Sequence, residues 1–257
     1  MNNTKLDITV VILTYNELKH IERCIKSLSG IVTRIVVIDS FSSDETCSLC
    51  RQLGADVYQN KWINYATQFQ WALDNCDINT SWTMRMDADE YLEAELISEL
   101  SMEFNNLPSS INGVYLKRKV IFKGRWIRFG GFYPHILLRI WKTGMGRIEQ
   151  RWMDEHIVMA APKTLIMKSD LVDDNLNNIG WWTEKHNGYA TREMIDLLNM
   201  KYGFIEKDNA LSETDDPQAK IKRLIKEKIY SRLPLGSRPL LYFNYRKCLP
   251  LGLLHCS

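Results

Sequence analysis

The sequence predicts an α/β fold with a mostly parallel central sheet and helices on both of its faces. Two observations carry this prediction: short β-branched runs alternate with amphipathic segments along residues 8–89, and polar or acidic residues directly follow most of these runs. Strands and helices that alternate in this way form parallel sheets, because a parallel connection needs a crossover segment. Ligands of such sheets bind outside the carboxyl ends of the strands, so we expect the functional site there.

The first elements follow from the spacing of the apolar residues. The predicted strands are residues 8–13, 34–38, 56–58 and 82–86. The predicted helices are residues 18–28, 42–53 and 63–75. Ser42 and Ser43 are suitable N-caps for the second helix, and Gly30 and Gly54 follow the ends of the first two.

After residue 89 the regular alternation of predicted strands and helices ends. The predicted elements there are a helix near residues 93–104, extended segments at 112–122 and 135–142, and a long amphipathic helix over about 181–200. Residues 205–219 are polar and are typical of a linker, and a basic amphipathic segment follows at 220–233. We therefore expect a catalytic domain over residues 1–204 and a C-terminal appendage over residues 205–257.

The charge of the chain is divided unevenly. The formal net charge of +2 argues against a dedicated nucleic-acid binder. Residues 1–219 hold 24 basic and 30 acidic side chains, whereas residues 220–257 hold nine basic and one acidic. Apolar faces flanked by Lys and Arg dock onto anionic bilayers, so the tail predicts contact with a membrane surface.

The apolar runs and cysteines indicate the compartment. Residues 8–13 are too short for the core of a signal peptide, and no segment approaches the length of a spanning helix. The six cysteines are expected to be reduced thiols. Cys47 and Cys50 form a single CxxC pair, which lacks the second pair or the His pair that a zinc site needs. These features predict a cytoplasmic protein.

Acidic side chains follow the fourth predicted strand. Asp87 and Asp89 point to the same side of an extended segment, with the small Ala88 between them. Two carboxylates so close together repel each other unless a cation or a donor lies between them. Oxygen ligands suit Mg²⁺ or Mn²⁺, and Mg²⁺ prefers one or two carboxylates together with phosphate oxygens. Asp39 ends the second strand, so all three carboxylates are expected at one edge of the sheet.

Glycine-rich nucleotide loops are absent from the sequence. A dinucleotide site needs G-x-G-x-x-G after the first strand, where this chain has residues 14–18, TYNEL. The P-loop pattern G-x-x-x-x-G-K-[ST] occurs nowhere in the chain. The remaining possibility is a nucleotide site that uses a metal ion for the diphosphate.

Three segments together resemble a known family. They are VVILTYNE at residues 10–17, IVVIDSFSSDET at 35–46 and MRMDADEYL at 84–92. The chain resembles the family 2 glycosyltransferases over roughly residues 7–200, and in particular the bacterial branch that builds lipopolysaccharide core, O-antigen or exopolysaccharide. The resemblance implies a GT-A fold with a Rossmann-like sheet, inversion at the sugar, and a nucleoside diphosphate sugar as donor, most simply a UDP-sugar.

The resemblance also assigns roles to residues. It implies that Thr14, Tyr15 and Glu17 lie along the nucleotide, with Tyr15 against the base, and that Asp39 accepts a hydrogen bond from that base. Asp87 would contact the ribose and the metal, Ala88 would lie between the aspartates, and Asp89 would hold the Mn²⁺ or Mg²⁺ that bridges the diphosphate. That metal would neutralise the departing nucleoside diphosphate.

An inverting enzyme needs a base that accepts the proton of the acceptor hydroxyl. The resemblance places this base in the segment RWMDEH, residues 151–156, where Asp154 is the first candidate and Glu155 the second. An acidic surface turn is the alternative reading of this segment. His156 is either the residue that orients the carboxylate or a structural histidine.

Further segments have two readings each. The basic stretch over residues 117–128 either meets the pyrophosphate of a lipid-linked acceptor or is a solvated strand. Trp181 and Trp182 either stack on sugar rings or belong to the core. The tail is shorter than the membrane-associated segments of the family, and it would hold the enzyme at the inner-membrane surface, or pack on the catalytic domain, or bind nucleic acid.

Two other classes of function remain as alternatives. The first is a metal-dependent phosphohydrolase with Asp87 as nucleophile and Asp89 as acid. Its aspartates would normally follow the first strand of the domain, and here they follow the fourth. The second alternative is a non-catalytic module that binds saccharide or membrane.

Overall fold

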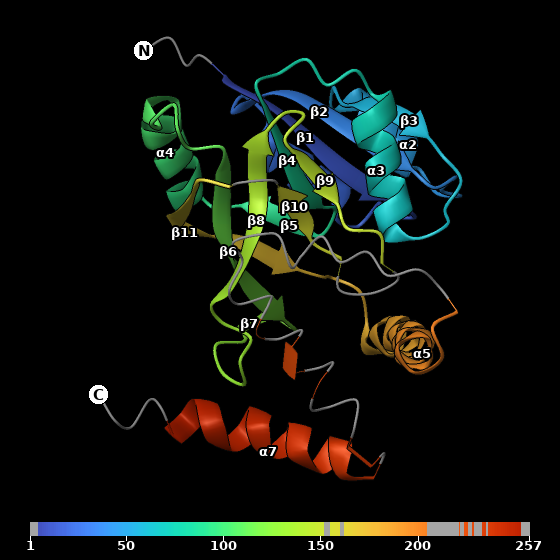
Figure 1. The fold of residues 1–257 in the computed structure, drawn as a ribbon. Coiled ribbons are helices and arrows are strands. Elements are labelled where there is room, and N and C mark those ends of the chain that lie inside the picture. Colours follow the sequence, from blue (N-terminus) through green and yellow to red (C-terminus); the bar gives the residue numbers. More distant parts are fainter. Residues whose placement is uncertain are drawn as a thin grey trace.

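The computed structural model has an α/β fold built on a nine-stranded mixed sheet (Figure 1). It describes residues 5–151, 155–159, 162–204, 221, 224, 225, 228, 233, 234 and 236–252. The strands are β1 (Leu6–Thr14), β2 (Val32–Asp39), β3 (Asp56–Gln59), β4 (Trp82–Asp87), β5 (Glu90–Leu92), β6 (Gly113–Phe122), β7 (Arg125–Trp126), β8 (His135–Lys142), β9 (Gly146–Ile148), β10 (Ile157–Met159) and β11 (Thr164–Asp174). The helices are α1 (Ile21–Leu28), α2 (Thr46–Gln52), α3 (Tyr65–Asn75), α4 (Ala94–Glu103), the 3₁₀ turn η1 (Phe104–Asn106), α5 (Ile179–Tyr202) and α7 (Ser237–Gly252).

The sheet has the strand order β3-β2-β1-β4-β8-β6-β11-β5, and β7 pairs with β6. The first four strands are parallel, as the sequence predicts. From β8 onward antiparallel pairs appear, because β8 runs against both β4 and β6. β9 and β10 form a separate two-stranded antiparallel sheet.

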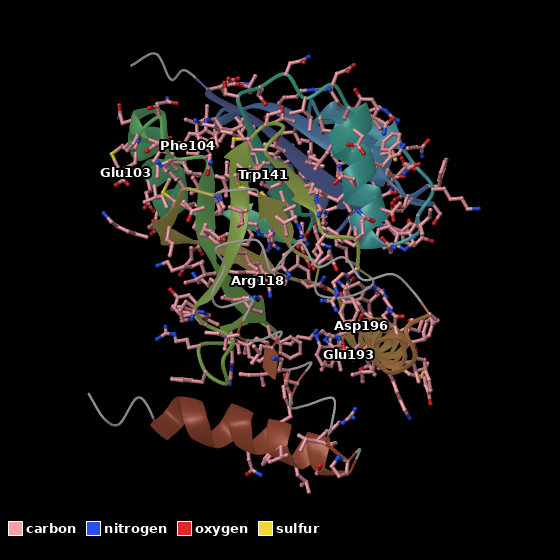
Figure 2. The ribbon with its side chains drawn as sticks, in the orientation of Figure 1. Glu103, Phe104, Arg118, Trp141, Glu193 and Asp196 are labelled. Atoms are coloured by element: carbon pink, nitrogen blue, oxygen red, sulfur yellow. The ribbon has the colours of Figure 1, made fainter. Side chains whose placement is uncertain are left out.

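The alternation of side chains along β1 divides the core into two layers. Val10 and Ile12 pack with α1, α2 and α4 on one face of the sheet. Val11, between them, packs on the other face with α3, β9 and β10. All three side chains are buried, and burying each one contributes about 1.5–3 kcal/mol to stability. Figure 2 shows that Trp141 lies in the body of the fold, where its ring packs on Phe69.

The described helices agree closely with the periodic patterns, but their first residues differ. The predicted helix over residues 63–75 is α3, and Asn64 caps it by accepting a hydrogen bond from the Thr67 N–H at 2.8 Å. The capping prediction for Ser42 and Ser43 is wrong, because α2 begins at Thr46. Ser42 donates to the Asp39 carboxylate and Ser43 to the Asn16 side chain. Both serines therefore join strand-end loops to each other instead of capping a helix.

The long helix α5 has well-defined ends. The Asn178 side chain accepts a hydrogen bond from the Trp181 N–H at 2.9 Å, and Gly203 ends the helix with a φ of 66°. That backbone conformation favours glycine. In Figure 1, α5 lies at the edge of the sheet where β1 and β4 end. No helix in the part of the chain that the structure describes combines the length and the apolar character needed to cross a membrane.

Gly146 provides a test of the core around Trp141. A Cβ atom at this position in β9 would lie 2.6 Å from atoms of the Trp141 ring, which is fully buried. We expect Gly146→Ala to lower the free energy of unfolding by about 1–3 kcal/mol, because overpacking displaces a rigid ring. Chemical denaturation measures this change. Gly188→Ala in α5 is the control: its nearest atom would be 4.0 Å away, and it should leave stability equal or higher. Equal stability of wild type and Gly146→Ala would contradict the packing.

Candidate functional site

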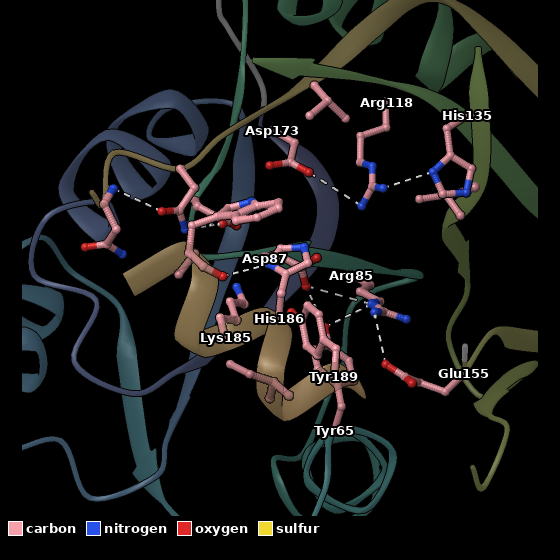
Figure 3. Close-up of a pocket in the computed structure, with 18 of the residues that line it drawn as sticks. Tyr65, Arg85, Asp87, Arg118, His135, Glu155, Asp173, Lys185, His186 and Tyr189 are labelled. Carbon is pink, nitrogen blue, oxygen red and sulfur yellow. Dashed lines mark hydrogen bonds and ion pairs between the residues drawn. The ribbon is translucent and has the colours of Figure 1, made fainter. Parts of the chain in front are cut away.

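A cleft of about 1220 Å³ opens at the carboxyl ends of the parallel strands (Figure 3). Residues at the ends of β1 and β4 form one part of its wall, and further parts come from β6, β8, β11, α5 and the segment before β10. Seven of the predicted site residues line this cleft: Thr14, Tyr15, Glu17, Asp87, Ala88, Asp89 and Glu155. The structure thus brings together residues that are far apart in the sequence.

Two side chains that follow β1, Tyr15 and Glu17, line the cleft in different surroundings. Tyr15 is 60% exposed and lines the cleft, so its ring is available to a ligand. Glu17 also lines the cleft, and its Oε2 atom lies 2.6 Å from the His20 Nδ1 atom. The Nε2 atom of His20 accepts a hydrogen bond from the Leu176 N–H at 2.9 Å. The buried His20 therefore joins the β1 loop to the segment that follows β11.

Asp39 lies beside Thr14 but is fully buried, and it is not among the residues that line the cleft. Its carboxylate accepts hydrogen bonds from the Thr14 hydroxyl at 3.0 Å, from the Ser42 N–H at 2.8 Å, and from the Ser42 hydroxyl. Burial alone would raise the pKa of Asp39, but the hydrogen bonds from Ser42 outweigh it and lower the pKa. In this arrangement the carboxylate holds the ends of β1 and β2 together.

Asp87 is surrounded by donors and cations. Its Oδ1 atom accepts a hydrogen bond from the Tyr65 hydroxyl at 2.6 Å, and the Arg85 Nε atom donates to that hydroxyl at 2.9 Å. Its Oδ2 atom lies 3.7 Å from the Arg139 Nη2 atom. Burial alone would raise the pKa of Asp87, but Arg139 and Arg85 outweigh it and hold the pKa well below its usual range. Asp87 is therefore a carboxylate at neutral pH.

A second carboxyl group, that of Glu90, accepts a hydrogen bond from the backbone of Asp87. Glu90 is buried, and its Oε2 atom accepts a hydrogen bond from the Asp87 N–H at 2.9 Å. Its Oε1 atom accepts from the Arg139 guanidinium, which is also buried. Burial raises the pKa of Glu90, and Arg139 opposes this shift. Glu90 and Arg139 thus fix both the backbone and the charge environment of Asp87.

The Asp89 carboxylate contacts the segment that follows β11, whereas Arg85 and Arg139 lie near Asp87. Its Oδ2 atom accepts a hydrogen bond from the Asn175 side chain at 2.9 Å. Burial, together with the charge of Asp89, raises the pKa of the nearby Asp173 to about 6. Arg118 opposes this shift, and its Nη1 atom lies 3.5 Å from the Asp173 Oδ2 atom. Figure 3 shows Arg118 between Asp173 and His135, whose Nδ1 atom is 3.0 Å from the Arg118 Nη2 atom.

The donor set near Asp89 suits a hard cation that takes its remaining ligands from a substrate. Among the described residues, no group of three or more His, Cys, Asp and Glu side chains is arranged to hold a metal ion. Mg²⁺ needs fewer protein ligands when phosphate oxygens are present, and one or two carboxylates then suffice. The repulsion between Asp89 and Asp173 is the kind of electrostatic stress that a cation relieves. Asp89 therefore fits such a site better than Asp87, which arginines already neutralise.

Glu155 faces the same cleft from the segment before β10. Its Oε1 atom lies 3.8 Å from the Arg85 Nη2 atom, so Arg85 joins Glu155 to the surroundings of Asp87. Figure 3 shows this arrangement, with Glu155 on the opposite side of Arg85 from Asp87. Asp154 lies outside the described residues. His156 lines the cleft, and its Nδ1 atom is 3.9 Å from the Glu149 carboxylate.

Helix α5 closes the cleft with aromatic and basic side chains. Trp181, Trp182, Lys185, His186 and Tyr189 all line it. The Trp182 and His186 rings stack with centroids 3.7 Å apart, and Trp182 is 39% exposed. The double tryptophan therefore belongs to the wall of the cleft and not to the core.

Acidic partners neutralise several cations of the basic stretch over residues 117–128, which lies on β6 and β7. Lys117 lies 3.7 Å from Asp170, and Lys119 lies 2.9 Å from Glu93. With Arg118 on Asp173, three of its cations are in ion pairs. The structure thus favours a structural role for these three, while Lys123 lines the cleft and donates to the Asn177 carbonyl at 3.0 Å.

Cys24, Cys47, Cys50 and Cys76 are free thiols. Cys50 is buried, and burial raises its pKa to about 12. Burial, together with Asp39, raises the pKa of Cys47 to about 11. Reactive thiols have lowered pKa values, so the raised pKa values of Cys47 and Cys50 argue against a redox role for this pair.

Sequence reasoning missed several residues of the site. Arg85 could have been found, because it precedes Asp87 and Asp89 at the same two-residue spacing on β4. Tyr65, Arg139 and Asp173 carry no local signal, since they come from α3, β8 and β11 and meet Asp87 and Asp89 through the fold. Lys185 and Tyr189 were visible only as polar and aromatic positions of the long helix.

The sequence profile of glycosyl transferase family 2 matches residues 9–176, which is well over half of the chain. The chain therefore belongs to glycosyl transferase family 2.

Two relatives illustrate the range of similarity. An uncharacterized glycosyltransferase of Rickettsia felis is 39% identical over 97 residues, which cover 38% of this chain and 34% of that protein. The lipopolysaccharide core biosynthesis glycosyltransferase LpsC of Rhizobium meliloti is 30% identical over 155 residues, which cover 56% of this chain and 54% of LpsC. The chain thus matches about a third of the length of the Rickettsia protein and about half of LpsC.

A solved structure shares the whole fold. Residues 1–349 of S. aureus TarS superpose with a TM-score of 0.53 at 12% identity, covering 95% of this chain and 81% of that one. The complex of the same TarS fragment with UDP gives a TM-score of 0.53, also at 12% identity, and covers 93% of this chain and 78% of that one. At this identity the likeness shows the GT-A type of fold.

Proposed function

We propose that this protein transfers a sugar from a nucleoside diphosphate sugar, most simply a UDP-sugar, to a saccharide acceptor with inversion at the anomeric carbon. One observation carries the proposal: residues of the first and third family segments and Glu155, from the acidic segment before β10, line one cleft, and Asp39 of the second segment lies beside Thr14 at the same end of the sheet. At about 1220 Å³ this cleft has room for a nucleotide sugar and part of an acceptor.

The donor fits the cleft along the carboxyl ends of β1 and β4. Tyr15 is exposed and offers its ring to the base, while Thr14 and Glu17 line the same side. Asp39 would receive the base after exchanging one of its internal hydrogen bonds, since Thr14 and Ser42 now occupy the carboxylate. Asp87 would meet the ribose, and Asp89 the diphosphate. The complex of TarS with UDP supports this choice of donor by fold.

The transfer is a single displacement. The acceptor hydroxyl oxygen attacks the anomeric carbon, and the bond from that carbon to the diphosphate oxygen breaks, leaving its electron pair on the nucleoside diphosphate. The hydroxyl proton passes to a carboxylate, for which Asp154 is our first candidate and Glu155 our second. Arg85 lies 3.8 Å from Glu155 and would keep that carboxylate turned toward the cleft.

A divalent cation, Mn²⁺ or Mg²⁺, fits this chemistry. Asp89 would hold it, with Asp87 behind it, and the cation would supply positive charge to the departing diphosphate. The protein's own groups do the rest: Tyr65, Arg139 and Glu90 hold Asp87 in place, and Asn175 orients Asp89.

We further propose a lipid-linked acceptor in bacterial polysaccharide synthesis and a peripheral position on the inner membrane. The name of LpsC supports the pathway, and the composition of residues 205–257 supports the membrane. Exposed apolar side chains on α7, namely Leu240, Leu241, Tyr242 and Phe243, together with nine basic residues from 220 onward, form the proposed appendage to a catalytic domain over residues 1–204. Nucleic acid has no place in this proposal.

A screen of nucleotide sugars by thermal unfolding tests the proposal. A ligand that binds the folded protein raises the unfolding temperature, so a matching UDP-sugar should raise it more with Mn²⁺ present than with EDTA. Other nucleotide sugars in the same screen identify a donor with a different base. A protein that no nucleotide sugar stabilises, or that instead releases phosphate from simple phosphoesters, would overturn the proposal in favour of the hydrolase.

A further inference from the structure

Lys185 is a cation on the wall of the cleft. It lies on α5 one turn after Trp181 and one turn before Tyr189, so the three side chains share one face of the helix. Its Nζ atom lies 4.7 Å from the centroid of the Trp181 ring and 6.0 Å from that of Tyr189. The side chain is partly buried and lines the cleft, and Figure 3 shows it near Asp87, His186 and Tyr189.

Five of the six other basic side chains that line the cleft contact a carboxylate or a backbone carbonyl. The basic side chains that line it are Arg85, Arg118, Lys123, Arg139, Arg151, Lys185 and Arg192. The four arginines at 85, 118, 139 and 151 are in ion pairs with carboxylates. Lys123 donates to a backbone carbonyl, and Arg192 lies 5.2 Å above the Tyr189 ring. In the described part of the chain, no carboxylate lies within 4.0 Å of the Lys185 nitrogen.

Lys185 lines the same cleft as the residues that we expect to contact the donor. Burial alone would lower its pKa, but Tyr189 and the charges of Asp89 and Glu17 outweigh burial and raise the pKa. Asp89 and Glu17 follow the ends of β4 and β1, and both line the same cleft as Lys185. Lys185 is therefore a protonated cation without a close carboxylate, in the same cleft as Asp89 and Glu17.

We propose that Lys185 binds the diphosphate of the nucleotide-sugar donor. This inference rests on the proposed function and extends it, because it places a second positive charge, supplied by the protein, opposite Asp89. An ammonium group with three donors suits phosphate oxygens, and it stays protonated throughout the transfer. Its charge stabilises the electron pair that the diphosphate oxygen takes when the anomeric carbon–oxygen bond breaks.

Binding measurements on the full chain without metal isolate the contribution of Lys185. Wild type, Lys185→Met and Lys185→Arg are titrated calorimetrically with UDP in EDTA, or with whichever nucleoside diphosphate the donor screen identifies. The matching nucleoside, uridine for UDP, is measured by ligand-observed NMR. A lost charge-assisted hydrogen bond should weaken UDP binding by Lys185→Met about 10-fold or more, while uridine binding stays the same and Lys185→Arg keeps most of the affinity.

Lys201→Met is the matched control. Lys201 lies near the end of the same helix, is exposed, and has its Nζ atom 5.0 Å from the Tyr202 ring centroid. The Lys201→Met variant should bind UDP with the affinity of the wild type. Equal UDP affinity of Lys185→Met and wild type, or equal weakening of UDP and uridine, would overturn the role of Lys185 alone. If the wild type binds no nucleoside diphosphate at all, the proposed function fails as well. The fold of each variant is intact if its unfolding temperature lies within about 2 °C of that of the wild type. Such a shift corresponds to a change of about 1 kcal/mol or less in the free energy of unfolding.

Discussion

Asp154→Asn is expected to lower the rate of sugar transfer by about 10²–10⁴-fold while the donor still binds with nearly unchanged affinity. A general base contributes this much to a reaction in which a hydroxyl proton must leave, and an amide cannot accept the proton. The donor contacts proposed above come from the ends of β1 and β4, so they should survive the change. Steady-state transfer assays and calorimetric titration of UDP measure the two quantities separately.

A second variant, Glu155→Gln, decides between the candidate carboxylates, and Asp74→Asn is its control. Glu155→Gln should reduce transfer less than Asp154→Asn, because Glu155 already compensates the charge of Arg85 at 3.8 Å. Asp74→Asn changes an exposed carboxylate on α3 and should have no effect. Full transfer by Asp154→Asn together with a large loss in Glu155→Gln would assign the base to Glu155. Full transfer by both variants would contradict a base in this segment.

Asp89→Ala is expected to abolish the effect of metal on donor binding. In the wild type, UDP should bind more tightly with Mn²⁺ than with EDTA, and in the variant the ratio of the two dissociation constants should fall to about one. The physical reason is that Asp89 is the carboxylate near the proposed diphosphate site that no arginine neutralises among the described contacts, so it is the one that would hold the cation. Calorimetric titration under both conditions gives the ratio.

The hydrogen bond to Asp89 offers a matched control. Asn175→Ala removes the donor that lies 2.9 Å from the Asp89 Oδ2 atom but keeps the carboxylate. This variant should retain a clear metal effect. A metal effect that persists in Asp89→Ala, or that disappears equally in both variants, would show that the carboxylate of Asp89 is not the metal ligand.

The parallel half of the sheet was predictable because its signals are local. Residues 8–13 and 34–38 are β-branched runs, and β1 and β2 contain them with a register that pairs Thr14 with Asp39. The strand ends at Thr14, Asp39 and Asp87 follow from where these apolar runs stop. Their meeting at one edge then follows from parallel topology, without any knowledge of side-chain contacts.

The charge pairing of the site was not predictable, because it depends on residues that are distant in sequence. Tyr65 and Arg139 reach Asp87 from α3 and β8, and neither stands out in its own segment. Ser42 was expected to cap α2, since serine favours that position. It donates instead to Asp39, because a buried carboxylate needs hydrogen bonds more than an exposed helix end does.

The position of Trp181 and Trp182 was also not predictable from the sequence. A double tryptophan on a helix is equally compatible with the core and with an open wall, because helical spacing defines a face but not what lies opposite it. The structure places Trp181 and Trp182 on the wall of the cleft, and Trp182 lies with its ring centroid 5.7 Å from that of Phe122 at the end of β6.

The anomeric configuration of the product decides whether this protein transfers a sugar by a single displacement. The wild-type protein is incubated with the donor from the screen and with a lipid-linked saccharide acceptor, and the glycoside is analysed by proton NMR while free nucleoside diphosphate is quantified. We expect one nucleoside diphosphate to be released for each glycoside formed, and the glycoside to have the anomeric configuration opposite to that of the donor. Retained configuration would contradict the single displacement, and nucleoside diphosphate release without any glycoside would contradict transfer to a saccharide.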